Sequence, residues 1–205
     1  MNEGDLRSAH MVASVLLGYP DERLHDGLDV LAEAVAGLPA GEARERLSAF
    51  LSHVAGTPPP ELAAHYVAVF DLKRRCCPYL TYYAYGDTRK RGAALLRFKH
   101  ALATAGFEPS DGELPDHLAV VCELSARGAV GPARRLMLES RPGIEVLRAA
   151  LEEERSPYAD VVAAVLATLR PSSARERQAA LRLAAQGPPA EAVGLEPYTF
   201  TEAGR

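Results

Sequence analysis

The chain has 205 residues, a length typical of one domain, and its formal net charge is −4. Alanine and leucine supply 63 residues, whereas valine, isoleucine and threonine together supply 23, too few for a large sheet. The composition argues against an extensive β protein. The ample apolar content and low net charge argue against a disordered chain.

Composition also argues against several functional classes. No run approaches 18 apolar residues, so no transmembrane helix is expected. The N-terminus has acidic residues where a signal peptide needs a basic region, so a cytoplasmic location is expected. Three cysteines give no disulfide framework. An isoelectric point near 5.9 argues against a general nucleic-acid binder.

The front half of the chain predicts helices, because apolar residues recur there at helical spacing. Asp5 and Asp21 are candidate N-caps for the first two helices. The proline run after Thr57 predicts a rigid break, with a subdomain joint near 57–60. Residues 79–85 are too short to form a full helix of their own. Helices are predicted over about 5–17, 21–35 and 41–54, and from 61 onward.

The back half continues the helical pattern after a loop at 107–112. Pro115 suits the first turn of a helix, which would place His117 in that turn as well. Helices are predicted over about 88–105, 115–127, 131–141, 144–155, 157–169 and 173–186. The sequence therefore predicts one globular all-α domain over residues 1–187, with about nine to eleven helices, followed by a flexible tail at 188–205.

The region from 66 to 99 differs in composition from the rest. Five of the eight tyrosines lie between 66 and 85, and residues 71–99 hold eight basic side chains against two aspartates. Tyrosine combines an apolar body with a polar tip and is enriched on binding surfaces. The plainer alternatives are a core edge for the tyrosines and a solvated face for the basic residues.

No constellation of residues predicts catalysis. Cys76 and Cys77 lack nearby partners at metal-binding spacing, so a structural role is favoured for them. Phosphate-binding loops, dinucleotide-binding turns and nucleophile elbows are absent from the sequence. The Glu-x-x-His pairs of a di-iron site are missing too. We therefore expect no enzymatic activity, no metal site and no permanently bound cofactor.

Three strings in the chain resemble the NarJ family. They are Tyr66-x-x-x-Phe70-Asp71, the YLTYYAYGDTRKRG string at 79–92 and the ELPDHL string at 113–118. The LGYP string at 17–20 and the EPYTF string at 196–200 also fit, whereas residues 130–190 resemble the family only in helical character. NarJ proteins are assembly chaperones of membrane-bound respiratory nitrate reductase and a branch of the TorD-like redox-enzyme maturation proteins.

The resemblance implies an all-α, cytoplasmic, non-enzymatic protein without nucleic-acid binding or membrane insertion. Such a chaperone binds the N-terminal segment of the catalytic α-subunit. It keeps the subunit open for insertion of the molybdenum bis-guanine-dinucleotide cofactor and an iron–sulfur cluster, and delays membrane docking. Proteins of molybdenum cofactor biosynthesis are further expected partners.

A client helix in a groove presents apolar anchors one turn apart, which suggests aromatic side chains as the groove lining. Aspartates and Glu123 would pair with basic residues of the client, and Gly86 and Gly92 would allow turns or close backbone approach. The predicted client-binding residues are Tyr66, Phe70, Asp71, Tyr79, Leu80, Tyr82, Tyr83, Asp87, Arg91, Asp116 and His117.

The basic excess at 73–99 has the wrong sign for a basic client. Arg89, Lys90 and Arg91 could instead face cofactor phosphates or an acidic patch on the client body, since arginine binds phosphate bidentately. Two alternatives remain open from the sequence. One is a chaperone for another molybdenum oxidoreductase, such as one exported by the twin-arginine route. The other is a helical DNA-binding regulator, although the only basic helix, at 88–100, carries apolar residues unsuited to a groove.

Overall fold

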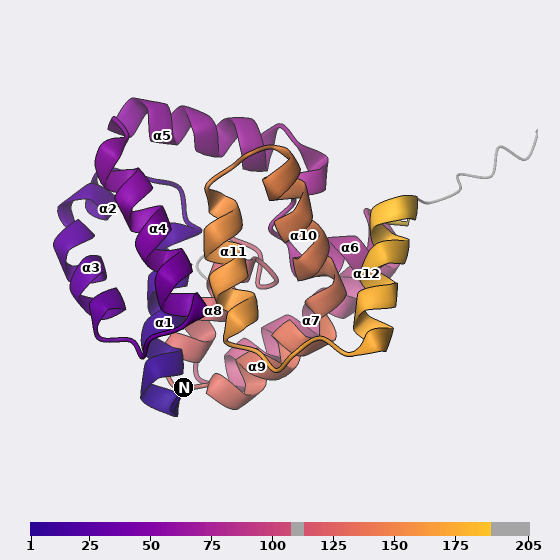
Figure 1. The fold of residues 1–205 in the computed structure, drawn as a ribbon. Coiled ribbons are helices and arrows are strands. Elements are labelled where there is room, and N and C mark those ends of the chain that lie inside the picture. The colour runs from indigo at the N-terminus through magenta and orange to yellow at the C-terminus, as the bar shows by residue number, and fades with distance from the viewer. Residues whose placement is uncertain (108–112, 190–205) are drawn as a thin grey trace, which may run out of the picture.

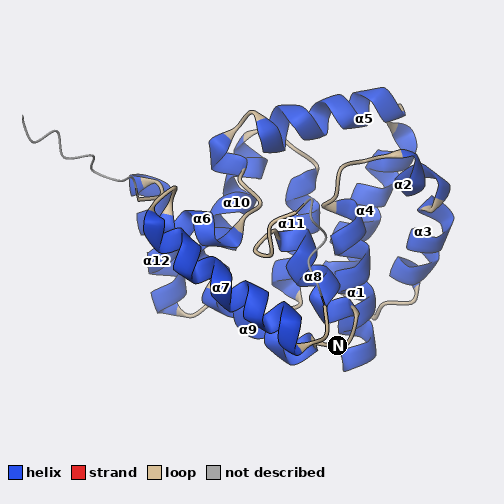
Figure 2. Ribbon diagram, turned by 180° about the vertical axis from the view of Figure 1, so that it is seen from behind, coloured by secondary structure: helices blue, strands red, loops and turns tan. Residues whose placement is uncertain are grey.

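The computed structural model describes residues 1–107 and 113–189, so most of the tail predicted at 188–205 lies outside the described residues. The prediction of an all-α fold is confirmed within this part of the chain, which forms helices and no strand (Figure 2). In chain order the α-helices are α1 (Glu3–Leu16), α2 (Glu22–Asp26), α3 (Leu28–Ala36), α4 (Glu42–Gly56), α5 (Pro59–Tyr66), α6 (Leu80–Tyr85), α7 (Arg89–Thr104), α8 (Leu118–Ala126), α9 (Val130–Glu139), α10 (Arg141–Glu153), α11 (Tyr158–Ala167) and α12 (Ala174–Gln186).

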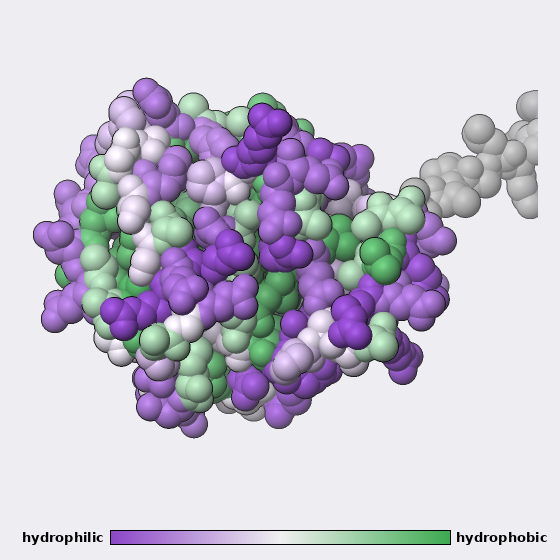
Figure 3. All heavy atoms as spheres, in the orientation of Figure 1, coloured by the Kyte–Doolittle hydropathy of each residue, from purple (hydrophilic) through white to green (hydrophobic). Residues whose placement is uncertain are grey.

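The core lies where α1, α4, α8, α10 and α11 pack against one another, with α11 next to α4 and α1 against α8 (Figure 1). α11 is apolar on nearly every side, as expected for a central helix. Phe50 of α4 and Tyr158 of α11 are among the largest fully buried side chains, and their rings lie 4.8 Å apart. Seen from outside, hydrophobic residues are interspersed among hydrophilic ones (Figure 3).

One buried histidine joins three core helices. His10 of α1 is fully buried, with Nδ1 2.7 Å from the Ser125 hydroxyl of α8 and Nε2 2.8 Å from the Thr168 hydroxyl at the end of α11. Burial, together with Arg134, lowers the pKa of His10 to about 4, so this link is made by a neutral ring.

Several predicted helix boundaries need correction. Asn2 caps α1 and Asp5 closes its capping box from the third helical position, so Asp5 is not the cap itself. The helix expected over 21–35 is divided at Gly27, although Asp21 does cap its first part. Residues 80–85 form a short helix after all, since tertiary packing supports it. The described residues therefore form twelve α-helices, whereas about nine to eleven were predicted.

The start of α8 differs most from the prediction. The helix begins at Leu118, and Pro115 lies before it in an irregular segment. His117 is the N-cap, and its Nδ1 accepts a hydrogen bond from the amide of Ala119 at 3.1 Å. The sequence pattern did not reveal that residues 116–118 pair with another segment of the chain. That pairing holds them out of the helix.

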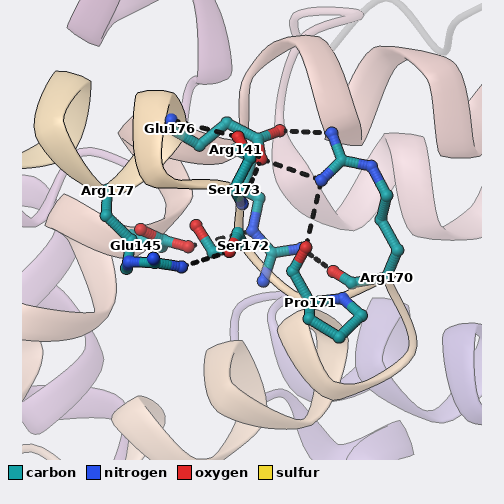
Figure 4. A network of polar contacts seen from close by, with 8 residues as sticks. All are labelled: Arg141, Glu145, Arg170, Pro171, Ser172, Ser173, Glu176 and Arg177. Carbon is teal, nitrogen blue, oxygen red and sulfur yellow. Dashed lines mark hydrogen bonds and ion pairs between the residues drawn. The ribbon is translucent and has the colours of Figure 1, made fainter.

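A polar network at its start fastens α12 to the rest of the fold (Figure 4). Ser173 and Glu176 form a capping box, and Glu176 accepts two hydrogen bonds from Arg170 at 2.7 and 2.8 Å. These hydrogen bonds lower the pKa of Glu176 to about 2. Arg141 of α10 donates to the Arg170 carbonyl at 2.5 Å. The helix itself has no buried residue, so the network and the α10 contact hold it in place.

Gly86 supports a close backbone approach, as the sequence suggested. Its φ is +55°, and a Cβ there would lie 1.7 Å from the carbonyl oxygen of Pro189, so the chain leaving α12 crosses directly over this glycine. The turn predicted at Gly92 is wrong, because Gly92 lies inside α7, whereas a close approach of a client to its open side stays a prediction.

Candidate functional site

Two segments far apart in sequence are clipped together beside α8. The amide of Leu80 donates to the Asp116 carbonyl at 2.9 Å, and the amide of Leu118 donates to the Pro78 carbonyl at 3.0 Å. The buried carboxylate of Asp116 completes this clip by accepting from the amide of Thr81 at 3.0 Å. We call this arrangement the 78–81/116–118 clip.

The clip sets Tyr79 and His117 side by side, with ring centroids 5.2 Å apart and planes at 80°. The Tyr79 hydroxyl donates to Glu113 at 2.9 Å. Burial lowers the pKa of His117, although the carboxylates of Glu113 and Asp116 oppose that effect. A neutral His117 agrees with the acceptor role of its Nδ1 at the start of α8.

A second aromatic group comes from the end of α5. There the helix widens into a π-helical turn, Val67–Asp71, in which the amide of Leu72 bonds to the Val67 carbonyl at 3.2 Å. Tyr66 and Phe70 pack with ring centroids 4.8 Å apart, and Tyr66 meets Tyr19 edge to face at 5.5 Å. The Tyr66 hydroxyl donates to the Leu17 carbonyl at 3.3 Å, which anchors the ring.

These groups surround one pocket of about 480 Å³. Its walls are the end of α1, the π-helical turn, the clip and one side of α8. We call it the aromatic–acidic pocket. The lining residues are Ser14, Gly18, Tyr19, Tyr66, Phe70, Asp71, Pro78, Tyr79, Glu113, His117, Ala119, Val120 and Glu123.

Negative charge dominates this pocket. Three carboxylates line it, those of Asp71, Glu113 and Glu123, and no lysine or arginine is among its described lining residues. Burial, with Glu113 and Asp71 nearby, raises the pKa of Tyr66 to about 12, so its phenol stays neutral. The pocket can therefore accept a ligand that combines an apolar group with a positive charge.

The structure brings five predicted client-binding residues into the aromatic–acidic pocket. These are Tyr66, Phe70, Asp71, Tyr79 and His117, and Glu123 joins them. Exposed apolar side chains stand next to pocket residues in the sequence, with Leu72 74% exposed beside Asp71 and Leu114 41% exposed beside Glu113.

Other predicted residues lie elsewhere. Leu80 and Tyr83 line a different, more apolar pocket of about 330 Å³ between α6, α7, α10 and α12. The Tyr83 hydroxyl donates to the Cys77 carbonyl at 2.9 Å, and the Tyr82 ring packs on Tyr83 at 5.7 Å. Both tyrosines are buried, so they contribute to the support of the clip rather than to the pocket wall.

The remaining predicted polar residues are engaged within the chain. Asp116 is fully buried in the clip. Arg91 donates to the Thr81 hydroxyl at 3.1 Å, lies over the Tyr79 ring at 5.6 Å and pairs with Asp87 at 3.5 Å. Arg91 therefore braces the clip from outside, and Asp87 also pairs with Arg74.

The sequence did not predict one aromatic ring and one carboxylate of the pocket. Tyr19 is 56% exposed and forms its rim, and Glu113 supplies one of its carboxylates. Both lie inside strings that carry the family resemblance, LGYP and ELPDHL. The signal was present, but only the fold shows that these strings meet at the same surface.

Distant carboxylates neutralise much of the basic run at 73–99. Lys73 and Arg75 pair with Glu154 at the end of α10, and Arg97 pairs with Glu139 of α9 at 3.4 Å. Part of the local charge excess is therefore balanced by acids that are remote in the sequence, Glu139, Glu153 and Glu154. Arg89 and Lys90 are exposed at the start of α7, and their suggested contact with a cofactor or client body stays a prediction.

The cysteines are placed as packing residues. Cys76 and Cys122 are fully buried, and burial raises the pKa of both thiols, while the pKa of Cys77 rises to about 11. Among residues 1–107 and 113–189, no group of three or more His, Cys, Asp or Glu side chains could hold a metal ion. In the same ranges, none of the helices has the length and apolar character needed to cross a bilayer.

Comparisons with known proteins show what the chain is related to. The family model described as "Nitrate reductase delta subunit" matches residues 36–164, which hold most of the aromatic–acidic pocket. The probable nitrate reductase molybdenum cofactor assembly chaperone NarJ of Bacillus subtilis is 32% identical over 176 residues, covering 86% of this chain and 96% of that protein.

Two further relatives match smaller shares of their own length. NarJ of Escherichia coli K12, named a nitrate reductase molybdenum cofactor assembly chaperone, is 30% identical over 73% of this chain and 64% of its own. The nitrate reductase-like protein NarX of Mycobacterium tuberculosis is 40% identical over 76% of this chain but only 23% of its own. With more than half its length matched by the family model, the chain belongs to the nitrate reductase delta subunit family, and its predicted NarJ resemblance is confirmed.

Proposed function

We propose that this protein is an assembly chaperone that binds the N-terminal segment of the apo catalytic subunit of respiratory nitrate reductase. The observation that carries the proposal is the aromatic–acidic pocket. Aromatic rings and three carboxylates converge there from four segments of the chain. The names of its relatives support nitrate reductase as the client.

The pocket suggests how such a segment would be held. An amphipathic helix would place an apolar anchor between the rings of Tyr66, Phe70 and Tyr79. A lysine or arginine one turn away would meet Asp71 or Glu113, where the partly buried surroundings strengthen ionic attraction. Binding needs little reorganisation, because the clip and the Tyr66 hydrogen bond already fix the rings.

In this proposal the protein acts by binding its client and does not catalyse a reaction. While the chaperone covers the N-terminal segment, the client would stay competent for insertion of the molybdenum cofactor and the iron–sulfur cluster, and would not yet dock at the membrane. The client, not this chain, receives the cofactor.

Calorimetry with a peptide of the client N-terminus tests the pocket. Phe70→Ala combined with Tyr79→Ala should weaken binding about 100-fold, because two central aromatic anchors are lost. Asp71→Asn combined with Glu113→Gln should weaken it about ten-fold at low salt and much less at high salt.

Matched controls separate the pocket from general effects. Tyr85→Ala removes a partly exposed tyrosine outside the pocket wall, and Glu33→Gln removes an exposed charge on α3. Unchanged affinity in the Phe70/Tyr79 double variant, with the fold verified by circular dichroism, would reject the pocket as the client site. The client itself is tested by pull-down of unassembled nitrate reductase against another molybdenum oxidoreductase.

A further inference from the structure

A second hollow, of about 530 Å³, lies beyond the last turn of α8, between the end of α7 and the start of α9. We call it the basic pocket. It contains His100, Arg127 and Arg135, and none of the described residues that line it carries a carboxylate. The lining residues are His100, Ala101, Thr104, Ala105, Phe107, Arg127, Gly128, Ala129, Pro132 and Arg135.

The two pockets meet at one ion pair on α8. Glu123 lines the aromatic–acidic pocket, and Arg127 lines the basic pocket. Their charged groups are 2.6 Å apart, and the two residues are one helical turn from each other. Arg127 also lies over the Phe107 ring at 5.4 Å. The charge of the surface therefore changes sign across a single turn of helix.

Arg135 offers its positive charge to a ligand, whereas Arg127 is already paired with Glu123. Arg135 is exposed, and neither it nor His100 makes an ion pair or hydrogen bond with any described residue. The start of α9 lies in the same wall, and its N-cap Ala129 has no side chain to cap the helix. The uncapped amides there add further partial positive charge.

We infer that the basic pocket binds an acidic side chain of the polypeptide segment whose basic residue occupies the aromatic–acidic pocket. The inference rests on the proposed function and adds to it a rule of charge order. The bound segment carries a basic residue that pairs with Asp71 or Glu113. It also carries an acidic residue, on the order of two helical turns away along the segment, that pairs with Arg135. A segment with only basic residues would fill one pocket and leave the other empty.

A double-mutant cycle with the full chain tests this rule. The probes are the N-terminal peptide of the nitrate reductase catalytic subunit and the same peptide with every Asp and Glu replaced by its amide. Arg135→Glu should weaken binding of the acidic peptide about ten-fold at low salt, and should leave the amide peptide within about two-fold. Arg23→Glu, on exposed α2, changes the net charge equally and should affect neither peptide.

Each outcome decides between clear alternatives. An equal loss for both peptides, or a loss matched by Arg23→Glu, overturns the charge-order rule while the proposed function stands. A wild-type chain that binds neither peptide overturns both. Inorganic pyrophosphate is the third probe. If Arg135→Glu abolishes its binding and leaves the acidic peptide unaffected, the pocket is a phosphate site, and the rule is again overturned.

Discussion

The carboxylate of Asp116 accepts hydrogen bonds from both the amide nitrogen and the hydroxyl of Thr81, at 3.0 and 2.5 Å. The two residues are 35 positions apart in the sequence, and both are buried. Their contact fixes the clip that places Tyr79 beside His117. One buried carboxylate thus positions rings that it does not touch.

Loss of this carboxylate should cost both stability and binding. Asp116→Ala leaves two buried donors of Thr81 without an acceptor, so we expect a loss of about 2–3 kcal/mol in the free energy of unfolding. Urea unfolding measures it. Asp87→Asn, whose side chain is 58% exposed, is the matched control and should change stability by less than about 1 kcal/mol. Equal losses in the two variants would mean that the clip is not held by Asp116.

Gly143 should tolerate no larger residue. A Cβ at this position would lie 2.9 Å from the Cβ of Tyr83, so Gly143→Ala must displace α6 from α10 and should destabilise the fold by about 1–3 kcal/mol. Gly92→Ala is the control, since it adds a methyl group in open space within α7 and should stabilise by about 0.5–1 kcal/mol. Thermal unfolding of both variants checks the opposite signs.

Gly86→Ala should be worse than Gly106→Ala, although both glycines have positive φ, +55° and +78°. The added Cβ strains the backbone in each case, and more so at Gly86, whose φ of +55° and ψ of −149° lie near a region that is essentially restricted to glycine. Only at Gly86 would it also collide with Pro189. Removal of residues 188–205 should therefore narrow the difference between the two losses in stability. If the difference is unchanged in the shortened chain, the collision with Pro189 does not contribute to it.

Acid should weaken the fold through His10. Its pKa is about 4 in the folded chain and 6.5 without the fold, so the unfolded chain binds more protons between these values. The contribution of neutral His10 is present above pH 6.5 and declines as the pH falls toward 4. At pH 5 we expect a loss of about 2 kcal/mol relative to pH 7.5. Urea midpoints over this range measure it. His10→Gln should flatten the dependence, whereas His100→Gln, on the exposed face of α7, should not.

Much of the fold was predictable, because helical periodicity and capping residues are local signals. Asp21 caps a helix where the sequence placed it, and Gly86 lies at a turn with positive φ. The start of α8 was not predictable, because the contacts of Asp116 with Thr81 that hold it out of a helix are made across the fold.

The site was predictable in part for the same reason. Tyrosines concentrated in one stretch marked the right region, but a stretch of sequence does not say which rings face one another. Tyr66 and Tyr79 reach the pocket, whereas Tyr82 and Tyr83 pack beneath the clip. The charge of the basic run could not be judged from the run alone, because two carboxylates that pair with it lie far along the chain. Glu139 belongs to α9, and Glu154 follows α10.

The π-helical turn Val67–Asp71 contains one residue more than an α-helical path would need there. If the same residues formed a regular α-helix, the residues after the turn would be rotated by about 100° relative to Tyr66. Tyr66 would keep its place, but Asp71 would turn away from Glu113 and the pocket would lose a carboxylate. The wider geometry of this turn, as well as its amino acids, therefore determines the site. Two chains with identical pocket residues, one with this π-helical turn and one with a regular α-helix here, would present different surfaces to a client.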